Sequence, residues 1–277
     1  MKQTNIYCPP YEILYIYYIQ GKVKALSEKQ LFLSHYIGNW VEADTSFLFF
    51  TCESREKIDQ LMAIQPELIL LDSFQMTYQE WCGGQFEVIS LADFIIAPPW
   101  MHKISEIDPR PIWLDPGVVF GAGTHPTTYD CLQAIDAAFS LYSIETMVDI
   151  GTGTGLLSLF GARKGAQRIV ALDLNPLAVQ TTQNNIQIND LDKHIFAVQA
   201  DASHLVTKSV DLWVANIHFD VLISLVQSPE FIRHKLFVIS GLMYSESLII
   251  KDLLSKLPVK IIQSWEGTWF TCLGATI

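Results

Sequence analysis

The spacing of hydrophobic residues divides this chain into two parts with different patterns. In the first 80 residues, short runs rich in Tyr, Phe and Ile alternate with two segments of helical spacing. These runs predict strands at residues 11–19, 40–43, 47–52 and 67–71, a helix at residues 27–38, and a second helix that begins at Ser54. The order β-α-β-β-α-β is the ferredoxin-like arrangement. We therefore expect residues 1–80 to form a small ferredoxin-like α+β domain.

The remaining residues change from a Gly- and Pro-rich stretch to a regular alternation of strands and helices. Residues 81–112 contain Gly83-Gly84 and Pro98-Pro99, which interrupt regular structure, so we expect a linker region with short strands such as residues 94–97. After it, helices are expected at 126–139 and from Leu156 and Pro176, and strands at 168–173, 195–200 and 210–215. Such alternation predicts a doubly wound, Rossmann-like α/β domain over residues 113–277.

Composition narrows the class of protein. Half of the 277 residues are hydrophobic and 17% are charged, which suits folded domains. No apolar run reaches the length of about 18 residues that a membrane span needs, and the N-terminus lacks a signal-peptide core, so we expect a cytoplasmic protein. The five cysteines are scattered without a C-x-x-C pair, which argues against disulfides and structural zinc. The net charge of −11 disfavours direct nucleic-acid binding and suits a basic protein partner.

The stretch Asp149-Ile-Gly-Thr-Gly-Thr-Gly155 lies between a predicted strand and a predicted helix. Glycines at such a turn let the backbone bend tightly and approach a ligand closely. A dinucleotide-binding turn has the spacing G-x-G-x-x-G, but here Leu156 stands where the third glycine would be. The spacing G-x-G-x-G behind an acid is similar to the S-adenosylmethionine turn of doubly wound methyltransferases. It disfavours a nicotinamide-dependent dehydrogenase.

Polar residues stand at the carboxyl ends of the later strands, where open parallel sheets bind ligands. Asp173 follows the glycines by about 20 residues, the position at which an acid holds ribose hydroxyls. Asp201 and Asn216 follow the next two strands. Any one of these residues could instead cap a helix or form a turn. Several of them in register favour a ligand site.

Residues 114–128 read L-D-P-G-V-V-F-G-A-G-T-H-P-T-T, directly before the glycine turn. This segment resembles the PrmA family of class I S-adenosylmethionine-dependent methyltransferases, which methylates large-subunit ribosomal protein eleven. The resemblance extends over residues 81–277 and includes Ser240-Gly241 and the sequence E-G-T-W at residues 266–269. It implies S-adenosyl-L-methionine as cofactor, a ribosomal protein as partner, no metal, and residues 1–80 as the substrate-recognition domain. We expect a monomer that methylates lysine side chains or an α-amine.

The resemblance also assigns site residues one at a time. Cofactor contacts are expected from Thr128, Gly151, Gly153, Asp173, Asp201, Ala202 and Asn216. Residues 117–128, which contain three glycines, are expected to close over the cofactor and exclude water.

The residues after Asn216 depart from the family. The sequence Asn216-Ile-His-Phe219 resembles the N-P-P-(Tyr/Phe) signature of amine methyltransferases, with Ile217-His218 in place of the two prolines. In that signature the Asn side chain and the next backbone carbonyl accept hydrogen bonds from the target amine, and the aromatic ring lies over it. Asn216 and Phe219 are therefore the candidate catalytic residues, although Phe219 equally suits core packing. His218 is a weaker candidate for a general base.

Two further functions stay open at this point. The departure after Asn216 could indicate a related methyltransferase for another protein or a small amine. A non-catalytic binding module that kept the nucleotide pocket is a third possibility, which intact residues at 151, 173 and 216 disfavour.

Overall fold

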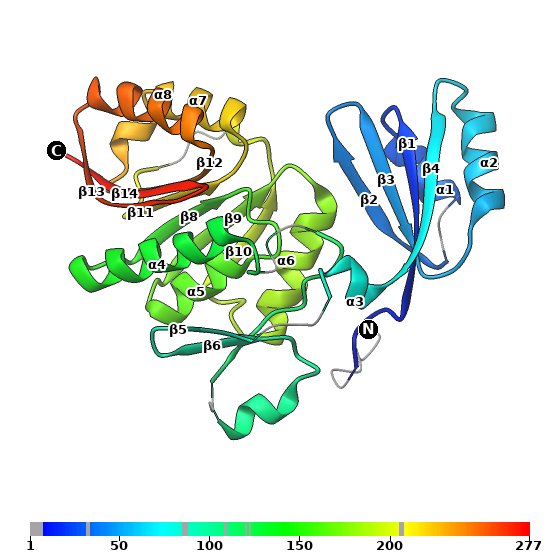
Figure 1. Ribbon diagram of the computed structural model, residues 1–277, viewed down its shortest axis with the longest axis horizontal. Helices are drawn as coiled ribbons and strands as arrows, with labels where there is room; N and C mark the ends of the chain where they lie inside the picture. The colour runs from blue at the N-terminus through cyan, green and yellow to red at the C-terminus, as the bar shows by residue number, and fades with distance from the viewer. Residues whose placement is uncertain are drawn as a thin grey trace. The chain divides into compact units, whose positions relative to one another are not determined.

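The computed structural model describes residues 8–31, 34–84, 88–107, 110–119, 121, 123–204 and 208–277. The chain divides into two compact units, which are described separately (Figure 1). The first unit comprises Met1–Phe86 and Trp100–His102, and the second comprises Glu87–Pro99 and Lys103–Ile277.

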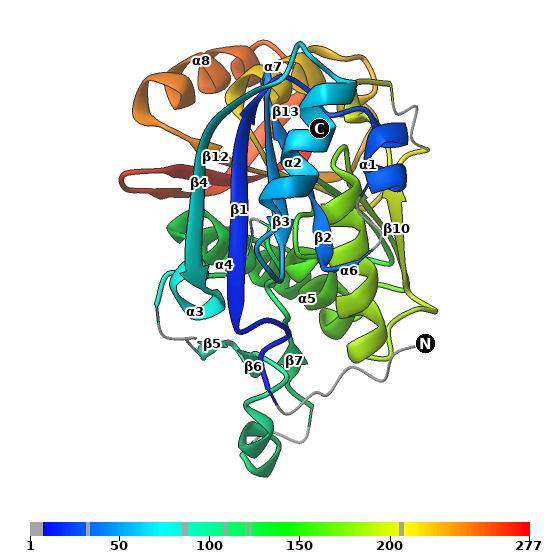
Figure 2. The same ribbon diagram turned by 90° about the vertical axis from the view of Figure 1, so that its right-hand side faces the viewer.

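The first unit is an antiparallel sheet with its two longer helices on one face (Figure 2). Its elements are β1 (Ile13–Gln20), α1 (Ala25–Leu31), β2 (Tyr36–Glu42), β3 (Thr45–Phe50), α2 (Arg55–Ile64), β4 (Ile69–Thr77) and the short α3 (Tyr78–Trp81). The sheet order is β2-β3-β1-β4, and each neighbouring pair is antiparallel. Residues of β1, β3 and α2, among them Tyr17, Phe50, Ile58 and Leu61, form its core. The predicted element order is confirmed.

The predicted boundaries in this unit were wrong in three places. The helix expected at residues 27–38 ends at Leu31, and residues 37 and 38 belong to β2, while Phe32 lies outside the described residues. The pairing of β2 with β3 and the packing of Tyr36 on Phe50, with ring centroids 5.1 Å apart, outweigh the helical spacing. The turn was expected at residues 44–46, but it consists of Ala43 and Asp44 only. Ser46 belongs to β3, where its hydroxyl donates to the Gly21 carbonyl and accepts from the Val23 N–H. Strand β4 continues to Thr77 because it pairs with β1 along its whole length.

The second unit is a doubly wound α/β domain. Its seven-stranded sheet has the order β10-β9-β8-β11-β12-β14-β13, in which the first five strands are parallel and the last two pair antiparallel. The strands are β8 (Thr146–Ile150), β9 (Arg168–Asp173), β10 (Ile195–Gln199), β11 (Leu212–Asn216), β12 (Leu236–Leu242), β13 (Val259–Glu266) and β14 (Phe270–Thr276). The predicted fold class of this part of the chain is confirmed.

Helices cover both faces of that sheet (Figure 1). One core lies beneath α4 (Pro126–Leu141), α5 (Leu156–Lys164) and α6 (Pro176–Ile188), and the other beneath α7 (Phe219–Gln227) and α8 (Tyr244–Ser255). The predicted helix starts at Pro126, Leu156 and Pro176 are correct. Asn175 caps α6, since its side-chain oxygen accepts from the Leu177 N–H at 2.9 Å.

The stretch expected to be a linker contains a small sheet of its own. Strands β5 (Ile89–Leu91), β6 (Phe94–Ala97) and β7 (Ile112–Trp113) form it, and Phe94 packs edge-on against Phe160 of α5 at 5.5 Å. Short 3-10 helices are found at His102–Glu106 (η1), Ala202–His204 (η2) and Phe231–Arg233 (η3). Among the described residues, no helix combines the length and apolar character needed to cross a membrane.

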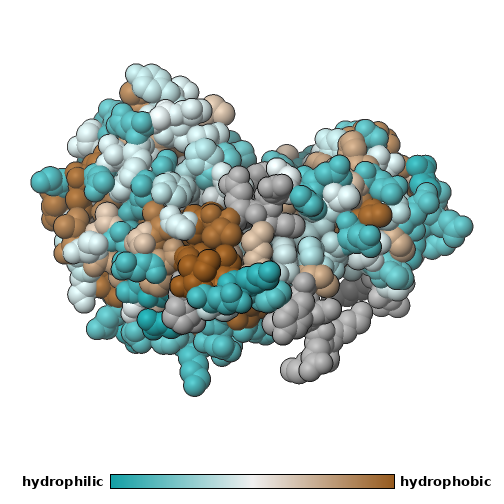
Figure 3. All heavy atoms as spheres, turned by 60° about the horizontal axis from the view of Figure 1, so that its bottom comes forward, coloured by the Kyte–Doolittle hydropathy of each residue, from teal (hydrophilic) through white to brown (hydrophobic). Residues whose placement is uncertain are grey.

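The surface drawn in Figure 3 is mostly hydrophilic, with a compact hydrophobic patch on the second unit. Exposed apolar side chains of this unit include Leu174, Tyr244 and Ile249. Compact apolar patches mark contact surfaces more often than isolated exposed residues do.

Candidate functional site

The strand order of the larger sheet reverses between β8 and β11, the point at which doubly wound sheets bind ligands. Gly151 follows β8 and Ile217 follows β11. These two strand ends touch, because a Cβ atom on Gly151 would collide with Cγ2 of Ile217. The two strand ends therefore approach each other closely where the strand order reverses, and the Ile217 side chain fills the space that a Cβ atom at position 151 would need.

The glycine turn has a left-handed backbone at all three glycines, with φ of 70° at Gly151, 57° at Gly153 and 85° at Gly155. Residues with side chains rarely adopt such angles. The N–H groups of Gly151 and Thr152 both donate to the carbonyl of Leu172, at 2.9 and 3.0 Å. These two hydrogen bonds anchor the turn to β9, and α5 begins directly after it.

Asp149 lies beneath this turn and is fully buried. Its Oδ2 accepts from the hydroxyls of Thr152 and Ser158, both at 2.7 Å, so one carboxylate joins the turn to the first part of α5. Burial raises the pKa of Asp149 to about 6, although both hydrogen bonds oppose the rise. The sequence pattern indicates an acid at this position but no separate role for it.

Asp173 ends β9 and faces the turn. Its Oδ2 accepts from the Gly153 N–H at 3.1 Å and its Oδ1 from the Asn175 N–H at 2.9 Å. Burial raises the pKa of this carboxyl, and the two N–H groups oppose the rise. Each carboxylate oxygen offers about two acceptor positions, so both can still accept from a ligand hydroxyl. Asp173, the residue expected to hold ribose, therefore ends its strand beside the glycine turn with acceptor positions to spare.

A polar face of α6 supports the turn from below, and sequence reasoning missed it. Thr182 donates to the Gly153 carbonyl at 2.9 Å, and Asn185 donates to the Thr154 carbonyl at 2.9 Å. Asn185 and Asn189 also pair with both backbone groups of Asp115 and Trp113, respectively. The spacing of residues 182, 185 and 189 could have indicated this face, because three polar residues lie on one side of the same helix.

The segment 117–128, expected to close over the cofactor, is tied to the same turn. Thr154 donates its hydroxyl hydrogen to the Gly121 carbonyl at 2.7 Å. A Cβ atom on Gly123 would meet the side chains of Ile89 and Leu156, so this glycine also marks a close approach. Phe120 and Ala122, which belong to the expected closing segment, lie outside the described residues.

Asn216 ends β11 beside the first turn of α4. Its Nδ2 donates to Oγ1 of Thr127 at 3.3 Å, and Thr127 and Thr128 are both buried. A Cβ atom on Gly241 would lie 3.1 Å from Oδ1 of Asn216 and 3.0 Å from the carbonyl oxygen of Ile217. Two acceptor oxygens, one from the Asn216 side chain and one from the Ile217 backbone, therefore lie close together at the end of β11.

The remaining expected residues have structural contacts of their own. Oδ1 of Asp201 accepts from the backbone and the hydroxyl of Ser203, at 2.9 and 2.6 Å, at the start of η2, which contains Ala202. Phe219 begins α7 and packs partly against the core on that face of the sheet. His218 is exposed and precedes α7 without a capping hydrogen bond from its side chain.

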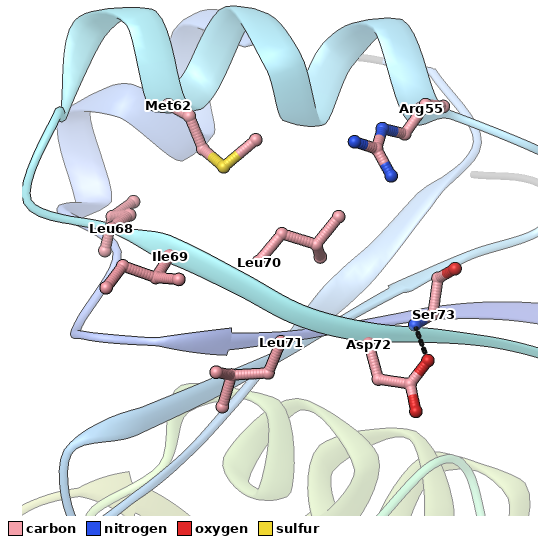
Figure 4. Close-up of a pocket in the computed structure, with 8 residues that line it drawn as sticks. All are labelled: Arg55, Met62, Leu68, Ile69, Leu70, Leu71, Asp72 and Ser73. Carbon is pink, nitrogen blue, oxygen red and sulfur yellow. Dashed lines mark hydrogen bonds between the residues drawn. The ribbon is translucent and has the colours of Figure 1, made fainter.

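A hollow of about 530 Å³ lies elsewhere, between α2 and β4 of the first unit (Figure 4). Arg55 and Met62 of α2 face Leu70 of β4 across it. None of the expected ligand residues lines this hollow. Within the described ranges, no group of three His, Cys, Asp or Glu residues has a geometry suited to a metal ion.

The fold and the turn define a Rossmann-like methyltransferase. A solved structure of the ribosomal protein L11 methylase from Lactobacillus delbrueckii subsp. bulgaricus is similar, with a TM-score of 0.60 and 26% identity over 69% of this chain and 99% of that one. The family profile "Ribosomal protein L11 methyltransferase (PrmA)" matches residues 55–276, and the chain belongs to this family.

Two relatives that carry the name ribosomal protein L11 methyltransferase support the assignment. The protein from Streptococcus thermophilus is 34% identical over 80% of this chain and 73% of its own length. The protein from Carboxydothermus hydrogenoformans is 34% identical over 71% of this chain and 68% of its own length.

Proposed function

We propose that this protein transfers methyl groups from S-adenosyl-L-methionine to amines of ribosomal protein L11. The observation that carries the proposal is the contact of Gly151 with Ile217 at the point where the strand order reverses, with Asp173 and Asn216 on either side. Membership of the family supports ribosomal protein L11 as the substrate.

The residues of the turn fit the cofactor. S-adenosyl-L-methionine supplies a methyl group on a positively charged sulfonium when it is bound. Gly151 and Gly153 would leave room for it, Asp173 would accept from its ribose hydroxyls, and Asp201 with Ala202 would contact the adenine edge. Thr128, buried at the start of α4, would enclose it.

Asn216 and Phe219 would position the acceptor. A free lysine amine has a pKa of about 10.4, so its nucleophilic form is scarce at neutral pH. Entry into a poorly hydrated site lowers that pKa, so the ammonium would release a proton to water before the transfer and the nitrogen lone pair would become available. Oδ1 of Asn216 and the carbonyl of Ile217 would then accept the N–H groups and aim the lone pair, while Phe219 would lie beside the amine. Positioning alone can supply about 7–11 kcal/mol, so this scheme requires no strong base.

The remaining parts of the proposal concern partners and location. Residues 1–80 would serve as the substrate-recognition domain and residues 113–277 as the methyltransferase domain, joined through residues 81–112. Both lysine side chains and the α-amine are candidate acceptors. The net charge of −11 suits a basic protein substrate better than direct contact with nucleic acid. We further propose a cytoplasmic monomer.

Transfer of a labelled methyl group tests the activity. Purified protein is incubated with labelled donor and either ribosomal protein L11 or a pool of small amines, and the products are located by mass spectrometry. Label on L11 supports the proposal. Label on small amines alone would instead indicate the related methyltransferase that the sequence after Asn216 left open.

Two substitutions test the assigned roles. Asp173→Ala is expected to weaken donor binding by about 1–3 kcal/mol, the usual loss for a hydrogen bond to a charged group, measured by calorimetry. Asn216→Ala is expected to reduce turnover more than donor affinity. Equal losses of turnover and affinity would make Asn216 a donor-binding residue instead.

A further inference from the structure

A chain of hydrogen bonds leads away from Asn216 to residues that the proposed function does not use. Oγ1 of Thr127 accepts from Nδ2 of Asn216 at 3.3 Å and lies 2.8 Å from Nδ1 of His125. His125 is also the N-cap of α4, where its Nδ1 accepts from the Thr127 N–H at 3.3 Å. Trp269 packs its ring against His125, with centroids 5.2 Å apart.

These contacts determine the direction of each hydrogen bond. Because Nδ1 of His125 accepts from a backbone N–H, it carries no hydrogen, and the imidazole has its hydrogen on Nε2. The Thr127 hydroxyl must then donate to Nδ1. Its oxygen is left with lone pairs only, so it can only accept from the neighbouring Asn216 amide. An Asn216 amide turned the other way would place an oxygen against those lone pairs.

Buried partners hold the backbone of the first turn of α4, which carries Thr127. Ser240 donates to the Thr127 carbonyl at 3.5 Å, and its Oγ lies 2.5 Å from Oγ1 of Thr271. Thr127 is 4% exposed, while Ser240 and Thr271 are fully buried. The first turn of α4 is thereby joined to β12 and β14, which fixes the backbone from which the Thr127 side chain projects.

We propose that Thr127 and His125 are positioning residues that fix the orientation of the Asn216 amide, so that its oxygen and the Ile217 carbonyl both face the acceptor amine. This inference rests on the proposed function for its chemistry. A Cβ atom on Gly241 would lie within 3.1 Å of both oxygens, so the two oxygens lie near each other beside the bare backbone of this glycine. The site thus selects an acceptor that can donate two hydrogen bonds.

The test compares Thr127→Val, which keeps the shape but removes the hydroxyl, with Thr127→Ser, which restores it. Thr127→Val is expected to lower kcat about tenfold, the equivalent of one hydrogen bond, while the donor Kd changes less than about twofold. Thr127→Ser is expected to recover most of the rate. An unchanged kcat in Thr127→Val would overturn the inference, and so would equal losses in the two variants, because restoring the hydroxyl would then restore nothing.

A second comparison uses Asn216→Asp, whose carboxylate offers an oxygen in either orientation. Thr127→Val is expected to cause little further loss of kcat in this background. A full tenfold loss there would mean that Thr127 acts through another group, and the inference would fail.

A readout without turnover separates this inference from the proposed function. The side-chain amide signal of Asn216, identified in ¹⁵N NMR spectra by its absence from Asn216→Asp, is expected to exchange faster with water in Thr127→Val. Thr276→Val, which removes a hydroxyl bonded to the His234 carbonyl, serves as the control and leaves that signal unchanged. If the protein does not methylate L11 but the Asn216 signal responds, only the proposed function falls. If the signal does not respond, the inference falls.

Discussion

The core of the first unit and the surroundings of the glycine turn in the second unit contain different kinds of buried side chain. In the first unit, aromatic rings meet edge-on or stacked, as in the pairs Tyr17–Phe50 at 5.7 Å and Tyr18–Phe47 at 4.6 Å. In the second unit, buried hydroxyl, amide and carboxyl groups surround the glycine turn, with Asp149, Thr154 and Asn185 fully inaccessible. Aromatic packing stabilises a unit through the area it buries, whereas hydrogen bonds also fix the direction of the groups they join.

The difference shows how a binding turn is kept in a conformation that is costly by itself. Three left-handed glycines at alternate positions can adopt many other backbone angles when unrestrained. Each backbone group that Thr182, Asn185 or Asp173 holds removes some of those alternatives. Among its described residues, the first unit has left-handed glycines at positions 21, 83 and 84 but no G-x-G-x-G turn, and its core consists of aliphatic and aromatic side chains.

The largest expected effect is a loss of stability that is confined to the first unit. Phe50→Ala removes a fully buried ring that contacts Tyr17 and Tyr36, and it is expected to destabilise the first unit by about 3–5 kcal/mol. Urea unfolding followed by NMR signals of each unit measures this loss, and calorimetry measures donor affinity, which is expected to be unchanged. Phe47→Ala, which removes a half-buried ring, is the control with the smaller loss. A parallel fall in donor affinity would contradict the separation.

The second effect tests the buried carboxylate under the turn. Burial raises the pKa of Asp149 from 3.8 to about 6, so between these pH values the folded state keeps a proton that the unfolded chain has lost. Stability is therefore lost as the pH rises through this window, and the full cost above pH 6 is about 3 kcal/mol. Asp149→Asn keeps an oxygen for Thr152 and Ser158 without the charge, so it is expected to be more stable than the parent protein at pH 7.

Urea unfolding between pH 4 and pH 7 measures this difference, which is expected to vanish near pH 4. A gain in stability that does not change with pH would contradict the explanation. Asp211→Asn is the control of opposite sign. Burial raises the pKa of Asp211, but hydrogen bonds from Lys235, Thr146 and Glu145 outweigh it and lower the pKa to about 2. Asp211 therefore stabilises the fold above pH 4, and its replacement is expected to destabilise the protein at pH 7.

The sequence predicted those parts of the site that depend on short stretches of chain. The glycine turn, Asp173 and Asn216 each follow a strand directly, so the strand pattern placed them at one edge of the sheet. The supports of the site depend on partners far away in the chain. Asn185 pairs with Asp115, 70 residues earlier, and Asn216 pairs with Thr127, 89 residues earlier. Local spacing carries no information about such pairs.

The same limit explains the errors in the first unit. Residues 27–38 have a helical spacing of apolar side chains, but His35 adopts a φ of 63° and its carbonyl accepts from the Thr51 N–H at 2.8 Å. That contact starts the pairing of β2 with β3. Pairing with β3 therefore determined the strand conformation of residues 36–38, although their own sequence favours a helix.

The smallest effect tests whether a single hydroxyl contributes to holding the turn. Thr182 donates to the Gly153 carbonyl, whereas the adjacent Thr181 donates to the Leu177 carbonyl within its own helix. Thr182→Val is expected to weaken donor binding by about 1 kcal/mol, because it leaves the Gly153 carbonyl without this partner. Thr181→Val makes the same chemical change one residue away and is expected to leave donor affinity unchanged. Calorimetric titration of both variants compares them, and equal affinities would mean that the turn keeps its conformation without the support of α6.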